Sequence, residues 1–164
     1  ECIADGLSRQ FTRLPRPMEI IQTDDKVIFH YEYFDVWRVA HLDRDTAPPQ
    51  TPQTLTGFSV GRWEGDTLVV ETINLHPQQA PRNAAPLSSE GKIIERFSRY
   101  SDEQILYTFE VSDPIYYTQN WRGEMSLNAS ENRLYEYACH EGNYGLPGIL
   151  AGARREDADA AAKE

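Results

Sequence analysis

Residues Gly61 to Asn74 read GRWEGDTLVVETIN, and this stretch predicts the class of fold. Gly65-Asp66 is a two-residue turn signal, and the runs on either side alternate with the period of a β-strand. The stretch therefore predicts a β-hairpin that turns at these two residues. Similar alternating runs fill most of residues 18 to 127, so the chain is predicted to be mainly β-structure.

Further strands are predicted on both sides of this hairpin. They cover Met18–Gln22, Lys26–Tyr33, 36–43, Lys92–Tyr100, Gln104–Ser112, Tyr117–Leu127 and Arg133–Ala138. In the second of these, Val27, Phe29 and Tyr31 share one face and Ile28 and His30 the other, and either face can be the inner one. The proline-rich stretch 44–56 is predicted to be a long loop, and loops of such length often act as lids. The stretch 76–91 is predicted to be a second irregular segment, at the mouth of the barrel.

Eight or nine antiparallel strands with short turns predict an all-β fold. We expect an antiparallel up-and-down β-barrel of the lipocalin or calycin type, with about eight strands and a short C-terminal helix, because closure removes exposed sheet edges. A barrel of this size holds side chains or one small ligand. A two-sheet sandwich is the alternative, and it would turn the polar strand positions toward solvent.

The length of 164 residues fits a single domain. Within that domain, residues 1–17 are predicted to form an irregular arm, and residues 148–164 a helix with an acidic tail. No apolar run is long enough to span a bilayer. The formal charge of −10 argues against a nucleic acid or an anionic membrane as partner. A small molecule is the expected partner, without a cofactor, and a homodimer stays open.

The chain has two cysteines, Cys2 and Cys139, which lie near its opposite ends. A bridge between them would close a loop of nearly the whole chain and stabilise the fold by about 4–5 kcal/mol. The spacing does not show that they meet, so a bridge and two unpaired thiols both stay open. A bridge would indicate an oxidising compartment. The first residue is Glu1, not Met, which predicts a mature form that has lost a targeting peptide.

The first candidate site consists of carboxylates on predicted strands, with arginines as partners. Its members are Glu32, Glu71, Glu95 and Glu110, with Arg38 and Arg96. Glu95 shares a face with Ile93 and Phe97, and Glu71 shares a face with Val69. A carboxylate on an apolar face must be paired, or its pKa rises until it can act as an acid near neutral pH. The alternative is a structural ion pair, such as Glu71 with Arg96.

The second candidate site is the segment Tyr135–Gly145, YEYACHEGNYG. Here His140 and Glu141 could serve as a base and its orienting partner if the chain folds back toward the cavity. Cys139 could be a nucleophile only without the bridge. The alternative is a turn pinned by a disulfide.

Aromatic residues and histidines form the third group of candidates. Trp121 shares a strand face with Gln119 and Gly123, and there it could line a cavity for a ring-bearing ligand or a sugar. Trp63 is predicted to clamp the hairpin, and core packing is the alternative for all three tryptophans. The four histidines have no metal-binding spacing, so no metal site is predicted. The residues expected to bind a ligand are Arg38, Arg96, Trp121, Tyr144, Tyr31 and His41.

Residues 18–43 read MEIIQTDDKVIFHYEYFDVWRVAHLD. With this stretch and the motifs GRWEGDTLVVETIN and YEYACHEGNYG, the chain resembles a family of exported bacterial β-rich proteins of uncharacterised function. The resemblance covers nearly the whole chain. It implies export to the periplasm or beyond the cell, and it agrees with a Cys2–Cys139 bridge. It implies no activity.

Three functions are compatible with these predictions. The first is the binding of a small apolar or aromatic molecule in the barrel cavity. The second is a cofactor-independent acid–base enzyme, an isomerase, cyclase, lyase or hydrolase, with Glu32, Glu71 or Glu95 as the acid or base and a Tyr or His as its partner. The third is an interaction module of an envelope complex. A binder should show an apolar pocket whose carboxylates are neutralised by arginine.

Overall fold

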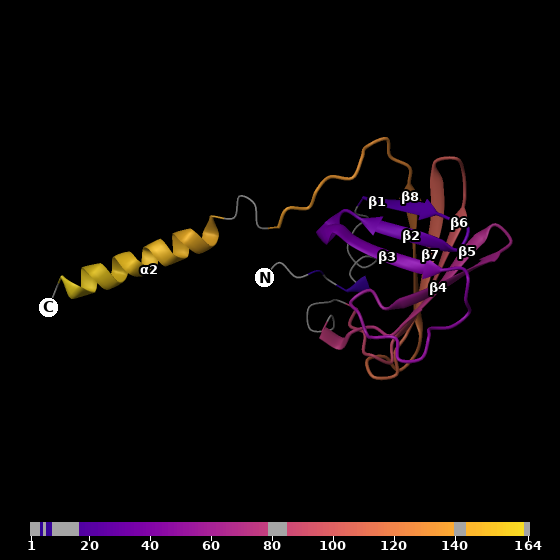
Figure 1. Ribbon diagram of the computed structural model, residues 1–164, viewed down its shortest axis with the longest axis horizontal. Coiled ribbons are helices and arrows are strands. Elements are labelled where there is room, and N and C mark those ends of the chain that lie inside the picture. The colour runs from indigo at the N-terminus through magenta and orange to yellow at the C-terminus, as the bar shows by residue number, and fades with distance from the viewer. Residues whose placement is uncertain (1–3, 5, 8–16, 79–84, 140–143, 163–164) are drawn as a thin grey trace.

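The computed structural model describes residues 4, 6–7, 17–78, 85–139 and 144–162. Eight strands form one sheet in chain order, and the sheet curls into a half-barrel (Figure 1). The strands are β1 (Met18–Gln22), β2 (Lys26–Tyr31), β3 (Val36–His41), β4 (Phe58–Glu64), β5 (Thr67–Ile73), β6 (Lys92–Arg99), β7 (Gln104–Ser112) and β8 (Trp121–Asn128). The predicted all-β barrel class with a C-terminal helix is confirmed.

Neighbouring strands pair antiparallel except at one place. β3 and β4 run parallel, with Ala40 opposite Ser59 and His41 opposite Val60. A parallel pair needs a crossover connection, and residues 42–57 supply it, so this part of the sheet departs from the up-and-down pattern. Among the described strands, no ladder joins β1 to β8. The half-barrel is therefore open between these two edges.

The predicted hairpin turn sets the register of β4 and β5. Gly65 has a φ of +60°, which glycine adopts without steric cost, and the strands pair from Glu64 opposite Thr67 onward. The same register brings Ser59 opposite Thr72 at the far end of the hairpin. Both side chains are buried, so the turn places two hydroxyls on the inner face of the sheet.

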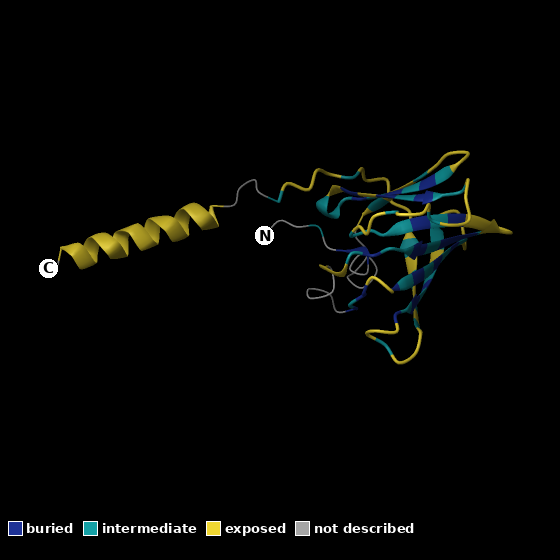
Figure 2. Cartoon of the chain, turned by 60° about the horizontal axis from the view of Figure 1, so that its bottom comes forward, coloured by how far each residue is buried: buried dark blue, intermediate teal, exposed yellow. Residues whose placement is uncertain are grey.

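The core fills the inner face of the curled sheet (Figure 2). Val27, Phe29 and Tyr31 point into it, which identifies the inner face of β2. The remaining buried apolar side chains come mainly from β5, β6 and β7. Leu7, from the N-terminal arm, is also fully buried in this cluster, and its N–H donates to the carbonyl of Leu55 at 3.0 Å. Leu7 therefore belongs to the core of the domain.

Gly123 on β8 allows a close approach between two strands. A Cβ atom at this position would lie 2.4 Å from the Phe109 ring, closer than carbon atoms can pack. The absence of a side chain lets the Phe109 ring cross in front of β8. In this place the ring meets Trp121 edge-on, with centroids 5.6 Å apart.

The prediction of a strand over Arg133–Ala138 is wrong. These residues have no ladder partner, and their contacts are with the turn between β2 and β3. The N–H of Tyr135 donates to the Glu32 carboxylate at 2.9 Å, and the Tyr137 ring packs against Phe34, with centroids 4.7 Å apart. The Glu32 carboxylate thus accepts the Tyr135 N–H, which a neighbouring strand would accept in a sheet.

β8 begins at Trp121, later than the predicted Tyr117. The buried Asp113 carboxylate organises the preceding residues into a turn, because it accepts hydrogen bonds from the N–H groups of Ile115 and Tyr116 at 2.9 and 3.2 Å. The Tyr117 N–H donates to the Asp113 carbonyl at 2.9 Å, so it is not available to a ladder.

The C-terminal helix α2 spans Gly145–Ala161 and begins three residues before the predicted boundary, Gly148 (Figure 1). Pro147 lies in its first turn, where proline is tolerated because that turn needs no internal N–H partner. No residue of α2 is buried, and the helix projects away from the sheet (Figure 2). Among the described residues, no helix has the length and apolar character to cross a membrane.

Candidate functional site

A buried ion pair lies at the centre of the half-barrel. Arg38 on β3 and Glu95 on β6 are 2% and 1% exposed, and Glu95 accepts hydrogen bonds from both Nη1 and Nη2 of the guanidinium. The Nη1–Oε1 distance is 3.1 Å. Arg38 Cζ also lies 5.2 Å from the centroid of the Phe29 ring. The carboxylate on the apolar face is therefore neutralised inside the core.

Three hydroxyl groups complete this network. Arg38 donates to Ser59 Oγ at 2.9 Å and to Thr72 Oγ1 at 2.7 Å, and these two hydroxyls are 2.8 Å apart. The Tyr107 hydroxyl donates to Glu95 Oε1 at 2.7 Å. Each charged group thus has several partners, which buried charges require to offset the loss of hydration.

The electrostatics of the cluster favour a charged Arg38 and neutral tyrosines. Burial lowers the pKa of Arg38, but Glu95 and the neighbouring tyrosines outweigh this and raise that pKa above its ordinary value. Burial, with the charge of Glu95, raises the pKa of Tyr107 well above its usual 10. Burial also raises the pKa of Tyr31. Tyr107 therefore keeps its proton and remains a donor to Glu95.

This pKa shift predicts a loss of stability in alkali. Above about pH 10 an unfolded tyrosine loses its proton while folded Tyr107 keeps its own, so the free energy of unfolding falls as the pH rises. The Tyr107→Phe variant should lose about 1 kcal/mol near neutral pH, where the hydrogen bond is present. It should also show a shallower fall between about pH 9 and about pH 11. Urea unfolding of both proteins checks this, and parallel pH curves would contradict it.

A pocket of about 760 Å³ opens on the inner face, at the end of the sheet where the β4–β5 and β6–β7 turns lie. We call it the mouth pocket. Its apolar wall consists of Val27, Leu68, Phe97 and Ile105, and its rim carries Trp63 and Tyr100. These two rim aromatics are 48% and 78% exposed. The rim also includes Ile20 and Gln22 of the edge strand β1, and polar residues of the two turns.

The mouth pocket adjoins the buried ion pair through two stacked rings. Phe97 lines the pocket, and its ring lies 5.0 Å from that of Phe29, which in turn contacts Arg38. The hydrogen-bonded network around Arg38 therefore lies directly behind this wall of the pocket. The arrangement offers a ligand an apolar wall and two exposed rings, but no unpaired charge from the Arg38–Glu95 network.

The four predicted carboxylates do not form one site, and Glu110 lies on the outer face of β7, bonded to Arg122. Glu95 and Arg38 meet in the core, with Tyr31 buried near them. Glu71 lies on the outer face and pairs with Lys92 at 2.8 Å, so the suggested pairing with Arg96 is wrong. The face that Glu71 shares with Val69 is not the inner face, although Val69 itself is buried. The Glu32 carboxylate lies at the β2–β3 turn, where it accepts the hydrogen bond from the Tyr135 N–H.

The other predicted residues are not brought together. Arg96 is on the outer face of β6, and Tyr144, which precedes α2, is 82% exposed. The His41 ring stacks on Phe58 with centroids 5.0 Å apart. Trp121 packs against Phe109 and Tyr117 at the end of the half-barrel opposite the mouth pocket.

Parts of the second candidate site are beyond the described residues. His140 and Glu141 lie there, as does Cys2 of the suggested bridge. Within the described part of the chain, no three His, Cys, Asp or Glu side chains are arranged to hold a metal ion. No residue of the loop 42–57 lines the mouth pocket, so the structure does not support a role for this loop as a lid over that pocket.

Sequence reasoning missed Ser59, Thr72, Tyr107, Tyr100 and Ile105. A signal for the first two was available, because a hairpin that turns at Gly65-Asp66 pairs Ser59 with Thr72. Tyr107 and Ile105 share the inner face of β7 with buried Phe109, and alternation along the strand would have identified them. Tyr100 follows the end of β6 and had no such signal.

Comparison with known proteins adds no family to this description. No family model matches the chain, and neither the curated proteins nor the solved structures contain a match to it. The structure itself defines the chain as an eight-stranded β-half-barrel with a buried ion pair and a pocket at one end. The resemblance to exported bacterial proteins stays a prediction.

Proposed function

We propose that the protein binds a small apolar or aromatic molecule in the mouth pocket. The observation that carries this proposal is the pocket wall of Val27, Leu68, Phe97 and Ile105, which connects an opening in the surface to the hydrophobic core. Small-molecule sites are concave and mainly apolar, with a few polar groups that fix orientation. The volume of about 760 Å³ lies in the range of such sites.

The rim supports a ligand with a ring or another flat surface. Trp63 and Tyr100 are exposed aromatics on two neighbouring turns, and aromatic side chains bind flat apolar groups through their faces. Arg99 at the rim lies 3.4 Å from the carboxylate of Asp102, and Asp66 adds a second negative charge to the lining. A ligand without strong negative charge therefore fits this end of the half-barrel best.

An acid–base enzyme has less support. Glu32, Glu71 and Glu95 each have a hydrogen-bond or ion-pair partner within the described residues. A catalytic pair requires a titratable group that is free to exchange a proton with a ligand atom. Since no observation favours such a group, binding is the function we propose.

The proposal is tested by a thermal-shift screen with aromatic acids, terpenoids and sugars, because a ligand that binds only the folded state raises the melting temperature. Ile105 and Leu106 are neighbours on β7 that face opposite sides of the sheet, so they form a matched pair. Ile105→Ala should weaken the best ligand by about tenfold, as expected for the loss of a few buried methylene groups. Leu106→Ala should leave its affinity unchanged.

Two outcomes would contradict the proposal. One is the absence of any stabilising compound in a screen that covers all three chemical classes. The other is a ligand whose affinity is equal in the Ile105→Ala and Leu106→Ala variants, because such a ligand would bind away from the mouth pocket.

We also propose that the protein is exported and contains a Cys2–Cys139 bridge. The support is the resemblance of its motifs to exported bacterial proteins, together with the finding that Cys139 is not a free thiol. Leu7 in the core and Tyr137 against Phe34 show that segments close to each cysteine are attached to the domain. A bridge would join the two segments to which Leu7 and Tyr137 belong.

A further inference from the structure

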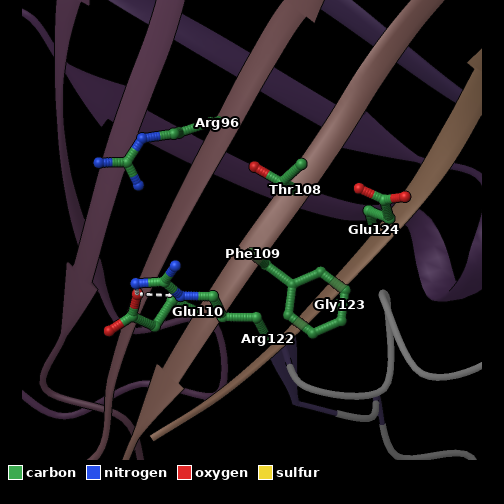
Figure 3. A pocket seen from close by; sticks show the side chains of 7 residues that line it. All are labelled: Arg96, Thr108, Phe109, Glu110, Arg122, Gly123 and Glu124. Carbon is green, nitrogen blue, oxygen red and sulfur yellow. Dashed lines mark hydrogen bonds and ion pairs between the residues drawn. The ribbon is translucent and has the colours of Figure 1, made fainter.

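A second pocket lies on the outer face of the sheet, across β6, β7 and β8 (Figure 3). We call it the outer pocket. Its volume is about 580 Å³, and its polar lining consists of Arg96, Thr108, Glu110, Arg122 and Glu124. Arg96 lies between Glu95 and Phe97, which point inward, so the outer pocket and the mouth pocket occupy opposite faces.

Two of the four charged groups in the outer pocket neutralise each other. Glu110 accepts a hydrogen bond from Arg122 Nε at 2.8 Å, and a second from Asn120 Nδ2 at 2.9 Å. The hydrogen bond from Asn120, followed by that from Arg122, lowers the pKa of Glu110. Glu110 is thus an anion with its hydrogen-bond partners already in place.

The other two charged groups have no direct partner within the described residues. There, neither the Arg96 guanidinium nor the Glu124 carboxylate has a hydrogen bond or an ion pair, although the charge of Arg96 contributes to the lowered pKa of Glu110. The strand register places them in one row with Thr108 between them, since Thr108 pairs with Arg96 on one side and with Glu124 on the other. In Figure 3 the Glu124 carboxylate lies near Thr108, and the Arg96 guanidinium lies on the far side of Thr108.

The spacing of this row selects a class of ligand. Two strand separations place the Cα atoms of Arg96 and Glu124 about 10 Å apart along the row. A free amino acid carries its charges much closer together, whereas an extended peptide of two or three residues separates its termini by about 7–10 Å. We propose that the outer pocket binds a short zwitterionic peptide, with its C-terminal carboxylate at Arg96 and its N-terminal ammonium at Glu124.

Thr108 and the pocket floor fit the same ligand. The Thr108 hydroxyl lies between the two charges, where a peptide group would pass, and it can donate or accept a hydrogen bond. Phe109 and Gly123 also line the pocket, and both occupy inward-facing positions of their strands, so they contribute backbone to its floor. The backbone of a short peptide can therefore lie against the strands between the two charged side chains.

The test uses triglycine with free termini, triglycine with an amidated C-terminus and triglycine with an acetylated N-terminus. Binding to the full chain is followed by NMR through the backbone amides of Thr108 and Gly123. The free peptide should shift these amides. Each capped peptide should bind about threefold to fivefold more weakly, as expected for the loss of one partly exposed ion pair.

Two variants assign the termini to their partners. Arg96→Gln should bind free and amidated triglycine equally, and Glu124→Gln should bind free and acetylated triglycine equally. Arg62→Gln is the matched control, because Arg62 stands on the same cross-strand row but outside the pocket, where it is paired with Glu64. This variant should discriminate between the peptides as the wild type does.

The proposal is overturned if free triglycine shifts neither amide, or if the capped and free peptides bind equally well to the wild type. It is also overturned if Arg96→Gln and Glu124→Gln discriminate as the wild type does. None of these outcomes bears on the mouth pocket, which lies on the other face.

Discussion

Glu95→Gln should lower the free energy of unfolding by about 3–5 kcal/mol, because it leaves the Arg38 guanidinium buried without a counter-charge. The side chain keeps nearly the same size, so the loss reports on charge and hydrogen bonding. Arg38 is 2% exposed, so its guanidinium cannot regain hydration unless the core unfolds. Urea unfolding followed by circular dichroism measures the difference.

Glu71→Gln is the matched control for this prediction. Glu71 also pairs with a cation across the sheet, at 2.8 Å from Lys92, but the two side chains are 32% and 41% exposed. Its loss should cost less than about 1 kcal/mol, since solvent replaces an exposed partner. Equal losses in the two variants would contradict the special role of the buried pair.

A double variant separates the net contribution of the ion pair to stability from the free energy lost when only one partner is removed. Arg38→Met combined with Glu95→Leu removes both charges and leaves Ser59 and Thr72 bonded to each other, so that within this network only the neutral Tyr107 hydroxyl loses its acceptor. Well-packed apolar side chains can replace a buried ion pair at little net cost. The double variant should therefore be more stable than Glu95→Gln alone, and a lower stability would contradict the account.

Reduction of the proposed Cys2–Cys139 bridge should have the second large effect. In the chain-entropy treatment, a loop of nearly the whole chain contributes about 4–5 kcal/mol, because the bridge restricts the unfolded state. A reducing agent should therefore lower the urea midpoint strongly. The Cys2→Ser/Cys139→Ser variant should show the same low midpoint with and without the agent.

The bridge also has a direct chemical test. Alkylation of the unfolded chain without a reducing agent should add no mass if the cysteines are bridged, and two alkyl groups should appear after reduction. Alkylation of both thiols before reduction would exclude the bridge. It would also remove one of the two supports for export to an oxidising compartment.

The fold class could be predicted because the hairpin at Gly65-Asp66 and the alternation in β2, β6 and β7 are local signals. The open edge between β1 and β8 could not be predicted, since closure of a barrel depends on how far the whole sheet curls. The parallel pairing of β3 and β4 could not be predicted either, because the crossover 42–57 has the composition of an ordinary loop. Arg133–Ala138 alternates like a strand, but Tyr135 in this segment donates its N–H to the Glu32 carboxylate, and the segment pairs with neither edge strand.

The candidate site could be predicted only in part. Glu95 was identified from its apolar neighbours, and the partner that neutralises it is Arg38. The same reasoning misplaced Glu71, because the outer face of β5 also carries a buried valine, Val69, and resembles an inner face in the sequence. The rim of the mouth pocket is assembled from two turns and an edge strand, and no local pattern shows that they converge.

The most direct test of the central claim uses the protein's three tryptophans. The Trp37→Phe/Trp121→Phe variant retains only Trp63, at the rim of the mouth pocket, and the Trp63→Phe/Trp121→Phe variant retains only the exposed Trp37. Each is titrated with the best stabilising compound while fluorescence is recorded. The account predicts a saturable change in Trp63 emission and none in that of Trp37. An unchanged Trp63 signal at saturating ligand would contradict it.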